Sequence, residues 1–163
     1  ASLGARVIAV TSTPEKAEKA EELGASDTIV GYDDVAKKVR ELTGGAGVDV
    51  SLDSVGKRSF EASLSSLTKR GWMISYGNAS GAGDPMPPGR LAAGGSLVLT
   101  RPTLFSFIDQ PEDLARGARH LFAAMKTGTF GADIGQRFYM KEAAKAHEAL
   151  ESGKTTGATV LLP

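Results

Sequence analysis

The chain has 163 residues, 19 of them Lys or Arg and 19 Asp or Glu, with two histidines and no cysteine. This length predicts one ordinary domain and is short for a two-domain enzyme, and the balanced charge argues against nucleic acid or an anionic membrane as a partner. The missing cysteines exclude disulfides and cysteine zinc sites, and two histidines are too few for most histidine metal sites. Since no long apolar run or signal peptide is present, we expect a soluble, cytoplasmic protein.

The first elements alternate between strand and helix. Residues 1–5 (ASLGA) are typical of a helix tail with a glycine stop, which suggests that the chain starts within a fold. Residues 6–10 (RVIAV) predict a buried parallel strand. Thr13 and Pro14 predict the start of a helix that ends at Gly24. The residues expected on its inner face are Ala17, Ala20 and Leu23.

The alternation continues through the middle of the chain. Residues 27–30 predict a strand, and Asp33 is expected to cap a helix that ends at Gly44. The inner face of this helix is predicted to carry Val35, Val39 and Leu42. Residues 48–53 predict the central strand, and residues 59–67 a helix with Phe60, Leu64 and Leu67 inward.

Residues 71–76 (GWMISY) predict the next strand, so the pattern is that of right-handed crossovers. We therefore predict an α/β fold: a Rossmann-like doubly wound parallel sheet in three layers, with helices on both faces. Residues 84–95 predict a loop, and residues 96–100 an edge strand. The last elements expected are a helix over 111–126, a strand at 138, an alanine-rich helix and a strand over 158–162.

In such a sheet, ligands bind at the carboxyl ends of the strands. The strand ends predicted here are small and polar: Thr11–Thr13, Asp53–Gly56 and Gly77–Ala79. Strand ends of this composition also occur in α/β proteins without a ligand at them. The first strand ends in hydroxyls without a carboxylate, and Lys16 follows, which favours NADP over NAD; the alternative is a solvated lysine on a surface helix. Tyr32 is a candidate for stacking on adenosine, or else a packing residue.

No catalytic constellation is visible in the sequence. Asp53 is more simply explained as a hydrogen-bond acceptor for neighbouring backbone than as a catalytic carboxylate. Tyr76 and Tyr139 lack a lysine four positions later, and nothing assembles a serine–histidine–acid triad or a metal site. No G-x-G-x-x-G motif opens a helix after a strand, so we expect the pyrophosphate-binding loop and the first strand of the sheet to precede Ala1.

The chain resembles the cofactor-binding half of the zeta-crystallin-like quinone oxidoreductases of the medium-chain dehydrogenase/reductase superfamily. The matching stretches, in the order of that family, are LGARVIAVTSTPEKAEKAEELGA, LTGGAGVDVSLDSVG, GWMISYGNASG, LVLTRP and AHEALESGKTTGATVLLP. The resemblance implies a cytosolic, zinc-free enzyme that uses NADPH to reduce quinones or α,β-unsaturated carbonyls, usually as a homodimer. It also implies that residues 1–130 form a partial cofactor domain and that 131–163 pack on a separate substrate domain.

The resemblance assigns roles to single residues. Those expected to border the cofactor, from the adenosine phosphate to the nicotinamide, are Ser12, Lys16, Tyr32, Ser54, Tyr76, Gly77 and Asn78. It names no catalytic side chain in this segment, and it makes 96–100 the strand that pairs in the dimer. Because the glycine-rich loop is missing, we expect this chain alone to be inactive. The alternatives are a non-catalytic nucleotide-binding or dimerisation module and another NADP reductase, such as an enoyl reductase.

Overall fold

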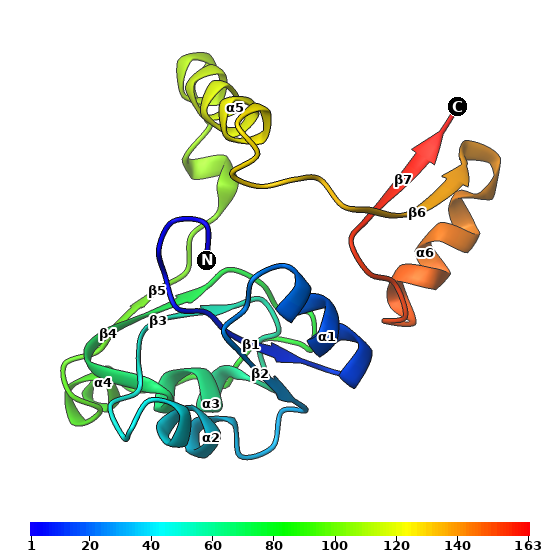
Figure 1. Cartoon of the computed structure of the whole chain (residues 1–163). Coiled ribbons are helices and arrows are strands. Elements are labelled where there is room, and N and C mark those ends of the chain that lie inside the picture. Colours follow the sequence, from blue (N-terminus) through cyan, green and yellow to red (C-terminus); the bar gives the residue numbers. More distant parts are fainter. The chain divides into compact units, whose positions relative to one another are not determined.

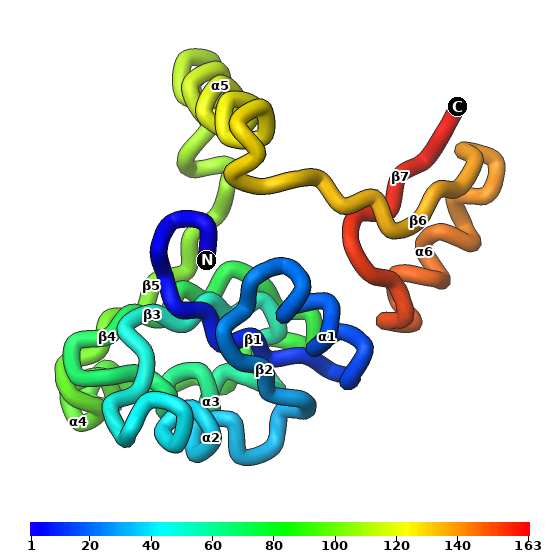
Figure 2. Tube along the Cα trace, viewed as in Figure 1, coloured from blue at the N-terminus to red at the C-terminus, as the bar shows by residue number.

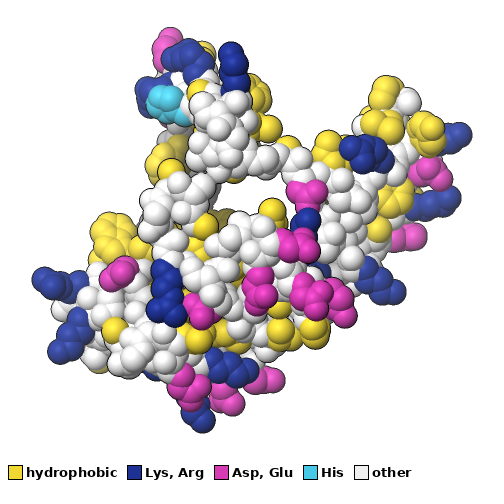
Figure 3. All heavy atoms as spheres, viewed as in Figure 1, with side chains coloured by type: hydrophobic (Ala, Val, Ile, Leu, Met, Phe, Trp, Pro, Cys, Tyr) yellow, Lys and Arg dark blue, Asp and Glu magenta, His cyan; other side chains and the backbone are white.

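The computed structural model describes all 163 residues, which divide into two compact units. The first unit comprises Leu3–Gln110 with Ala1, and the second comprises Pro111–Pro163 with Ser2. None of the helices combines the length and apolar character needed to cross a bilayer. Figure 3 shows Lys and Arg side chains on the visible face together with Asp and Glu side chains, as expected for a chain of zero net charge.

The first unit contains two parallel sheets, one with the strand order β1-β2 and one with the order β3-β4-β5. The strands are β1 (Ile8–Thr11), β2 (Asp27–Val30), β3 (Val48–Asp53), β4 (Leu67–Ser75) and β5 (Val98–Thr100). Each strand pair is parallel, and β5 lies at an edge, so both predictions are confirmed. β1 and β3 each pair on one side alone, and this separates the two sheets.

Helices cover these strands on two sides (Figure 1). The helices of the first unit are α1 (Pro14–Glu22), α2 (Val35–Leu42), α3 (Phe60–Ser65) and α4 (Gly89–Ala93), followed by the 3-10 helix η1 (Leu104–Ser106). α1 contacts β1 and β2, whereas α2 and α3 contact each other, with α3 against β3 and β4. The trace in Figure 2 follows these crossovers from strand to helix to strand. The predicted α/β, Rossmann-like architecture is confirmed.

Two apolar clusters form the core of the first unit. Met73 of β4 is fully buried and packs with Leu64, Leu67 and Leu97. The second cluster joins Ile29 of β2 to the inner face of α2, and its buried members are Ile29, Val35 and Val39. Val48 packs against both clusters, so the start of β3 connects them. The predicted inner face of α2 is therefore confirmed.

Several predicted boundaries were wrong. The third helix ends at Ser65, and Leu67 already begins β4, which leaves Tyr76 just beyond the strand. Leu67 is nevertheless buried, because the first position of β4 faces the same core as the helix. The loop predicted over 84–95 contains the short helix α4.

Two further details of the helices differ from expectation. Leu23 is 67% exposed because α1 ends before it, at Glu22. Asp34, not Asp33, stands at the start of α2, and its left-handed backbone makes no side-chain cap. The predicted Thr13 cap is confirmed, since its hydroxyl accepts a hydrogen bond from the Lys16 amide.

The second unit begins with α5 (Pro111–Lys126), whose bounds match the prediction. β6 (Ile134–Tyr139) and β7 (Ala158–Leu162) form a parallel pair, and α6 (Ala143–Glu151) connects them after the 3-10 turn η2 (Met140–Glu142). The predicted strand–helix–strand segment is confirmed, with its first strand starting four residues earlier than expected because Ile134 already pairs with Ala158. The role of residues 131–163 in packing on another domain stays a prediction.

Candidate functional site

A cavity of the first unit lies between the facing edges of β1 and β3 and has a volume of about 960 Å³. We call it the β1–β3 trough. Its walls are residues 8–10 of β1 and 48–53 of β3. Its floor is formed by small or apolar side chains of α2, α3 and the turn after α3, namely Val35, Val39, Ala62, Ser63 and Ser66. Ser54 and Val55 line the trough where β3 ends.

Asp53, the last residue of β3, organises this end of the trough. Its side chain is buried, with 3% of the residue exposed. Its Oδ1 accepts hydrogen bonds from the amides of Val55 and Gly56, both at 2.9 Å. The hydroxyls of Ser59 and Ser63 donate to the same carboxylate, Ser63 at 2.7 Å from Oδ2. This confirms that Asp53 serves the backbone of the turn that follows it, as the sequence suggested.

The environment of Asp53 favours its ionised form. Burial by itself opposes ionisation, but the hydrogen bonds from Gly56, Ser63, Ser59 and Val55 outweigh it and lower the pKa of Asp53 below its ordinary value. No buried side-chain polar atom in the structure lacks a partner. This geometry suits a structural role, in which the Asp53 carboxylate fixes the turn after β3. It does not suit proton transfer from Asp53.

Two glycines bring the ends of β3 and β4 into direct backbone contact. A Cβ on Gly77 would stand 2.4 Å from the carbonyl oxygen of Ser54, and one on Gly56 would stand 2.3 Å from that of Gly81. Gly56 also has a φ of +84°, which disfavours other residues. The Ser80 hydroxyl donates to the Val55 carbonyl at 2.7 Å. The residues after β3 (54–56) and those after β4 (77–81) are therefore in direct contact, and we call them together the interlocked platform.

Tyr32 lies after β2 and lines the trough. The guanidinium carbon of Arg58 stands 4.8 Å from the centre of its ring, a cation–π contact. Arg58 did not emerge from the sequence analysis, because this contact depends on the loop after β2 meeting the start of α3. The contacts of Ser59 and Ser63 with Asp53 could have been predicted from the sequence. Two serines four residues apart lie on the same face of a helix, where both can reach one acceptor.

The end of β1 presents hydroxyls beside the start of α1. The Thr11 hydroxyl donates to the Thr13 carbonyl at 3.1 Å, and Thr13 caps the helix. Ser12 is exposed, and Lys16 lies in the first turn of α1. Ser12 and Lys16 do not line the trough.

The structure brings only part of the predicted site together. Tyr32, Ser54 and Tyr76 line the trough. Gly77 and Asn78 belong to the interlocked platform, because a Cβ on Gly77 would meet Ser54 and the Cα of Asn78 would stand 3.0 Å from a Cβ on Gly56. The cofactor-binding roles of the seven predicted residues stay a prediction.

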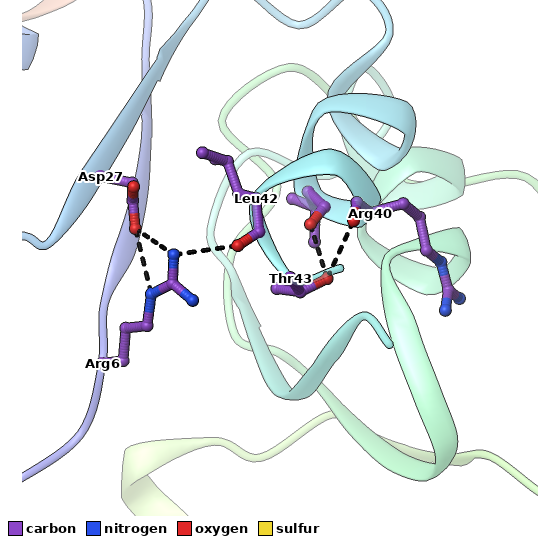
Figure 4. Close-up of polar contacts among 6 residues, drawn as sticks. Arg6, Asp27, Arg40, Leu42 and Thr43 are labelled. Carbon is purple, nitrogen blue, oxygen red and sulfur yellow. Dashed lines mark hydrogen bonds and ion pairs between the residues drawn. The ribbon is translucent and has the colours of Figure 1, made fainter. Parts of the chain in front are cut away.

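Two arginines and a threonine connect α2 to its surroundings, and Figure 4 shows the contacts of Arg6 with Asp27 and Leu42. Nη2 of Arg6 donates to the carboxylate of Asp27 at 2.8 Å and to the carbonyl of Leu42 at 3.0 Å. Arg40 donates to four carbonyl oxygens, those of Gly45, Ala46, Ser65 and Leu67. The Thr43 hydroxyl donates to the Val39 carbonyl and accepts from the Gly47 amide. α2 is therefore tied to β1 through Arg6 and to the start of β3 through Arg40 and Thr43.

No group of three or more His, Cys, Asp or Glu side chains in the structure is placed to hold a metal ion. The residues present therefore do not form a metal centre.

Comparison with known proteins gives the context of this site. The family described as zinc-binding dehydrogenase matches residues 1–124. A quinone oxidoreductase of Pseudomonas aeruginosa is 45% identical over 99% of the chain and 50% of its own length. A 2-haloacrylate reductase of a Burkholderia species is 43% identical over 99% of the chain and 49% of its own length. The chain therefore spans about half the length of these curated relatives.

Solved structures show the same fold. A mycobacterial protein in complex with NADPH superposes with a TM-score of 0.94 at 43% identity, covering 99% of this chain and 51% of that one. Escherichia coli quinone oxidoreductase, also in complex with NADPH, superposes with a TM-score of 0.91 at 39% identity, covering 99% of this chain and 50% of that one.

Proposed function

Because the chain belongs to the zinc-binding dehydrogenase family, we propose that it is the cofactor-binding portion of an NADPH-dependent quinone oxidoreductase. The observation that carries the proposal is the match along nearly the whole chain to two proteins solved with NADPH. The residues matched include the trough, the platform and the start of α1. The relatives named quinone oxidoreductase and 2-haloacrylate reductase support a quinone or an α,β-unsaturated carbonyl compound as the substrate.

The residues of the first unit suit the adenosine side of NADPH. Ser12 and Lys16, at the amino end of α1, offer a hydroxyl and an ammonium for the adenosine phosphate. Tyr32 offers a ring face for the adenosine, and Arg58 makes a cation–π contact with the same ring. The amino end of a helix also favours negative charge. This combination is the reason to propose NADPH rather than NADH.

The platform suits the other end of the cofactor. The backbones of Gly77 and Ser54 are in contact. We propose that Tyr76, Gly77 and Asn78, which follow β4, would border the nicotinamide side of the cofactor. NADPH, when bound, supplies the hydride. We assign no catalytic side chain to this chain, and its contribution is to position the cofactor.

We also propose the assembly and location that the family resemblance implies. β5 is an edge strand of three residues, and pairing with its copy in a homodimer would cover that edge. Residues 131–163 would pack on the substrate domain of the longer protein. The protein would act in the cytoplasm.

The test is a measurement on the protein extended to the length of its relatives. We expect it to oxidise NADPH in the presence of a quinone such as 1,4-benzoquinone, and to prefer NADPH to NADH. Absence of NADPH binding by fluorescence titration would refute the proposal. Binding without turnover of any quinone or enone would favour a non-catalytic nucleotide-binding module.

The 163-residue chain alone gives a second test. It lacks a glycine-rich G-x-G-x-x-G loop, so we expect neither quinone reduction nor tight NADPH binding from it. Enzyme-like oxidation of NADPH by this chain would show that the loop is not needed.

A further inference from the structure

The guanidinium of Arg58 lies over the ring of Tyr32, and its carbon atom is 4.8 Å from the ring centre. A guanidinium is planar and delocalised, so it is attracted to the face of an aromatic ring. Because a plane has two sides, contact with Tyr32 leaves the opposite side of the guanidinium for a second flat group.

The side chain of Arg58 has no other protein partner. It is exposed and makes neither an ion pair nor a side-chain hydrogen bond. Arg90, in contrast, donates to both carboxylate oxygens of Glu61, and Arg40 donates to four carbonyl oxygens. Those two arginines stabilise the fold with their N–H groups, whereas the N–H groups of Arg58 remain for a ligand.

The backbone that carries Arg58 is fixed to the interlocked platform. The Arg58 amide donates to the hydroxyl of Ser80 at 3.0 Å, and this hydroxyl donates in turn to the carbonyl of Val55 at 2.7 Å. Arg58 is therefore held at its amide by Ser80 and at its guanidinium by Tyr32, although its side chain is exposed.

The Arg58–Tyr32 pair lies where β1 and β2 end. These strands are parallel neighbours, and the amide of Gly31 donates to the carbonyl of Thr11 at 2.8 Å just beyond their last pair. Ser12 and Tyr32 therefore leave the ends of adjacent strands. Tyr32 also lines the trough. The pair thus stands at the side of the trough that the proposed function assigns to the adenosine.

We propose that the adenine base of NADPH stacks on the side of the Arg58 guanidinium that faces away from Tyr32. Arg58 is then a binding residue, and Tyr32 is the residue that positions it. This inference rests on the proposed function, because it takes NADPH as the ligand. Adenine is flat and aromatic, and bases stack on guanidinium planes as well as on aromatic rings.

The proposal separates recognition of the base from recognition of the phosphate. NADPH and NADH carry the same adenine, so a stack on Arg58 strengthens the binding of both equally. Lys16 is proposed to act on the phosphate, which NADH lacks. Arg58 therefore contributes to affinity and not to the choice between the two cofactors.

The test is fluorescence titration of the protein extended to the length of its relatives. The ligands are NADPH, NADH and ADP-ribose, which has the adenosine but no nicotinamide and is measured by displacement of NADPH. Arg58→Ala should weaken the binding of all three by the same factor, at least about fivefold. Arg58→Lys keeps the charge without the plane and should weaken binding nearly as much. Lys37→Ala, which removes an exposed cation from α2, is the matched control and should bind like the parent.

A double variant tests the role of Tyr32. In a Tyr32→Leu background the guanidinium loses the ring that holds it, so its removal matters less. Arg58→Ala should then change the three affinities by less than about twofold. An undiminished effect of Arg58→Ala in this background would overturn the positioning role of Tyr32.

Three outcomes would overturn the stack itself. These are unchanged binding of ADP-ribose by Arg58→Ala, a loss confined to NADPH, which would make Arg58 a phosphate ligand, and full binding by Arg58→Lys, which would show that charge alone acts. Failure of the parent protein to bind NADPH would refute the proposed function and this inference together. The other outcomes are all measured on a parent that binds the cofactor, so they bear on Arg58 alone.

Discussion

The hydroxyl of Ser59 lies 2.8 Å from Oδ1 and 2.7 Å from Oδ2 of Asp53, so one serine at the start of α3 contacts both carboxylate oxygens. The same carboxylate holds the amides of Val55 and Gly56. A single buried charge therefore connects the end of β3, the turn that follows it and the next helix.

Replacing this carboxylate should destabilise the first unit. Asp53→Asn keeps the shape of the side chain but places an amide NH₂ against groups that donate hydrogen bonds. We expect a loss of about 1–3 kcal/mol in the free energy of unfolding at pH 7. Urea unfolding followed by the fluorescence of Trp72, the single tryptophan, measures it. Asp49→Asn, at an exposed position on the same strand, is the control and should change little.

Asp53 also predicts a pH dependence of stability. Its pKa is lower in the folded chain than in the unfolded chain, where it is about 4. The stabilisation is therefore complete above the unfolded pKa and is lost as the pH falls through the folded pKa. Urea unfolding between pH 7 and pH 2.5 should show a smaller acid-induced loss for Asp53→Asn than for the parent chain. Equal losses would show that Asp53 does not contribute.

Gly77→Ala tests the contact between the two strand ends. The new Cβ would meet the backbone of Ser54 at 2.4 Å, so the ends of β3 and β4 must separate. We expect destabilisation of about 1–3 kcal/mol, the usual cost of overpacking. Gly89→Ala is the matched control, because no atom lies within 4 Å of a Cβ built there. If both variants unfold at the parent's urea midpoint, the contact is not rigid.

Arg40→Lys tests the connection between α2 and β3. A lysine ammonium cannot reproduce a planar guanidinium that reaches four carbonyl oxygens, of which that of Leu67 is 2.7 Å away. We expect a loss of about 2 kcal/mol in the free energy of unfolding. Lys37→Arg, an exposed change on the same helix, should be neutral. Unchanged urea unfolding of Arg40→Lys would mean that a positive charge at this position is enough to stabilise the first unit, without the planar guanidinium.

Lys16→Gln tests the proposed choice of cofactor in the protein extended to the length of its relatives. Removing the ammonium should weaken NADPH binding by about tenfold, equivalent to about 1.4 kcal/mol, and leave NADH binding nearly unchanged. Fluorescence titration with both cofactors measures the ratio. Lys37→Gln on α2 should leave the ratio as it is. An equal effect of Lys16→Gln on both cofactors would argue against a phosphate contact.

The order of most helices and strands could be predicted from the amino-acid sequence, because hydrophobic periodicity and the Gly and Pro residues that end elements are local properties. The run at 48–53 and the helix at 111–126 were predicted with the bounds that the structure has. Thr13 was recognisable as a cap because its role depends on the three residues that follow it. Leu67 was wrongly predicted as the last residue of a helix. Its spacing from Phe60 and Leu64 fits a helix, but an apolar residue is equally expected at the first position of a buried strand, which is where it lies.

How residues from separate elements meet could be seen only in the folded chain. The contact of Arg58 with Tyr32 and the four carbonyls around Arg40 join residues from separate elements, and no spacing in the sequence encodes them. The same holds for the trough, because only the fold showed which two strand edges face each other. Strand edges are defined by their pairing, which depends on the packing of the whole unit and not on the residues of one strand.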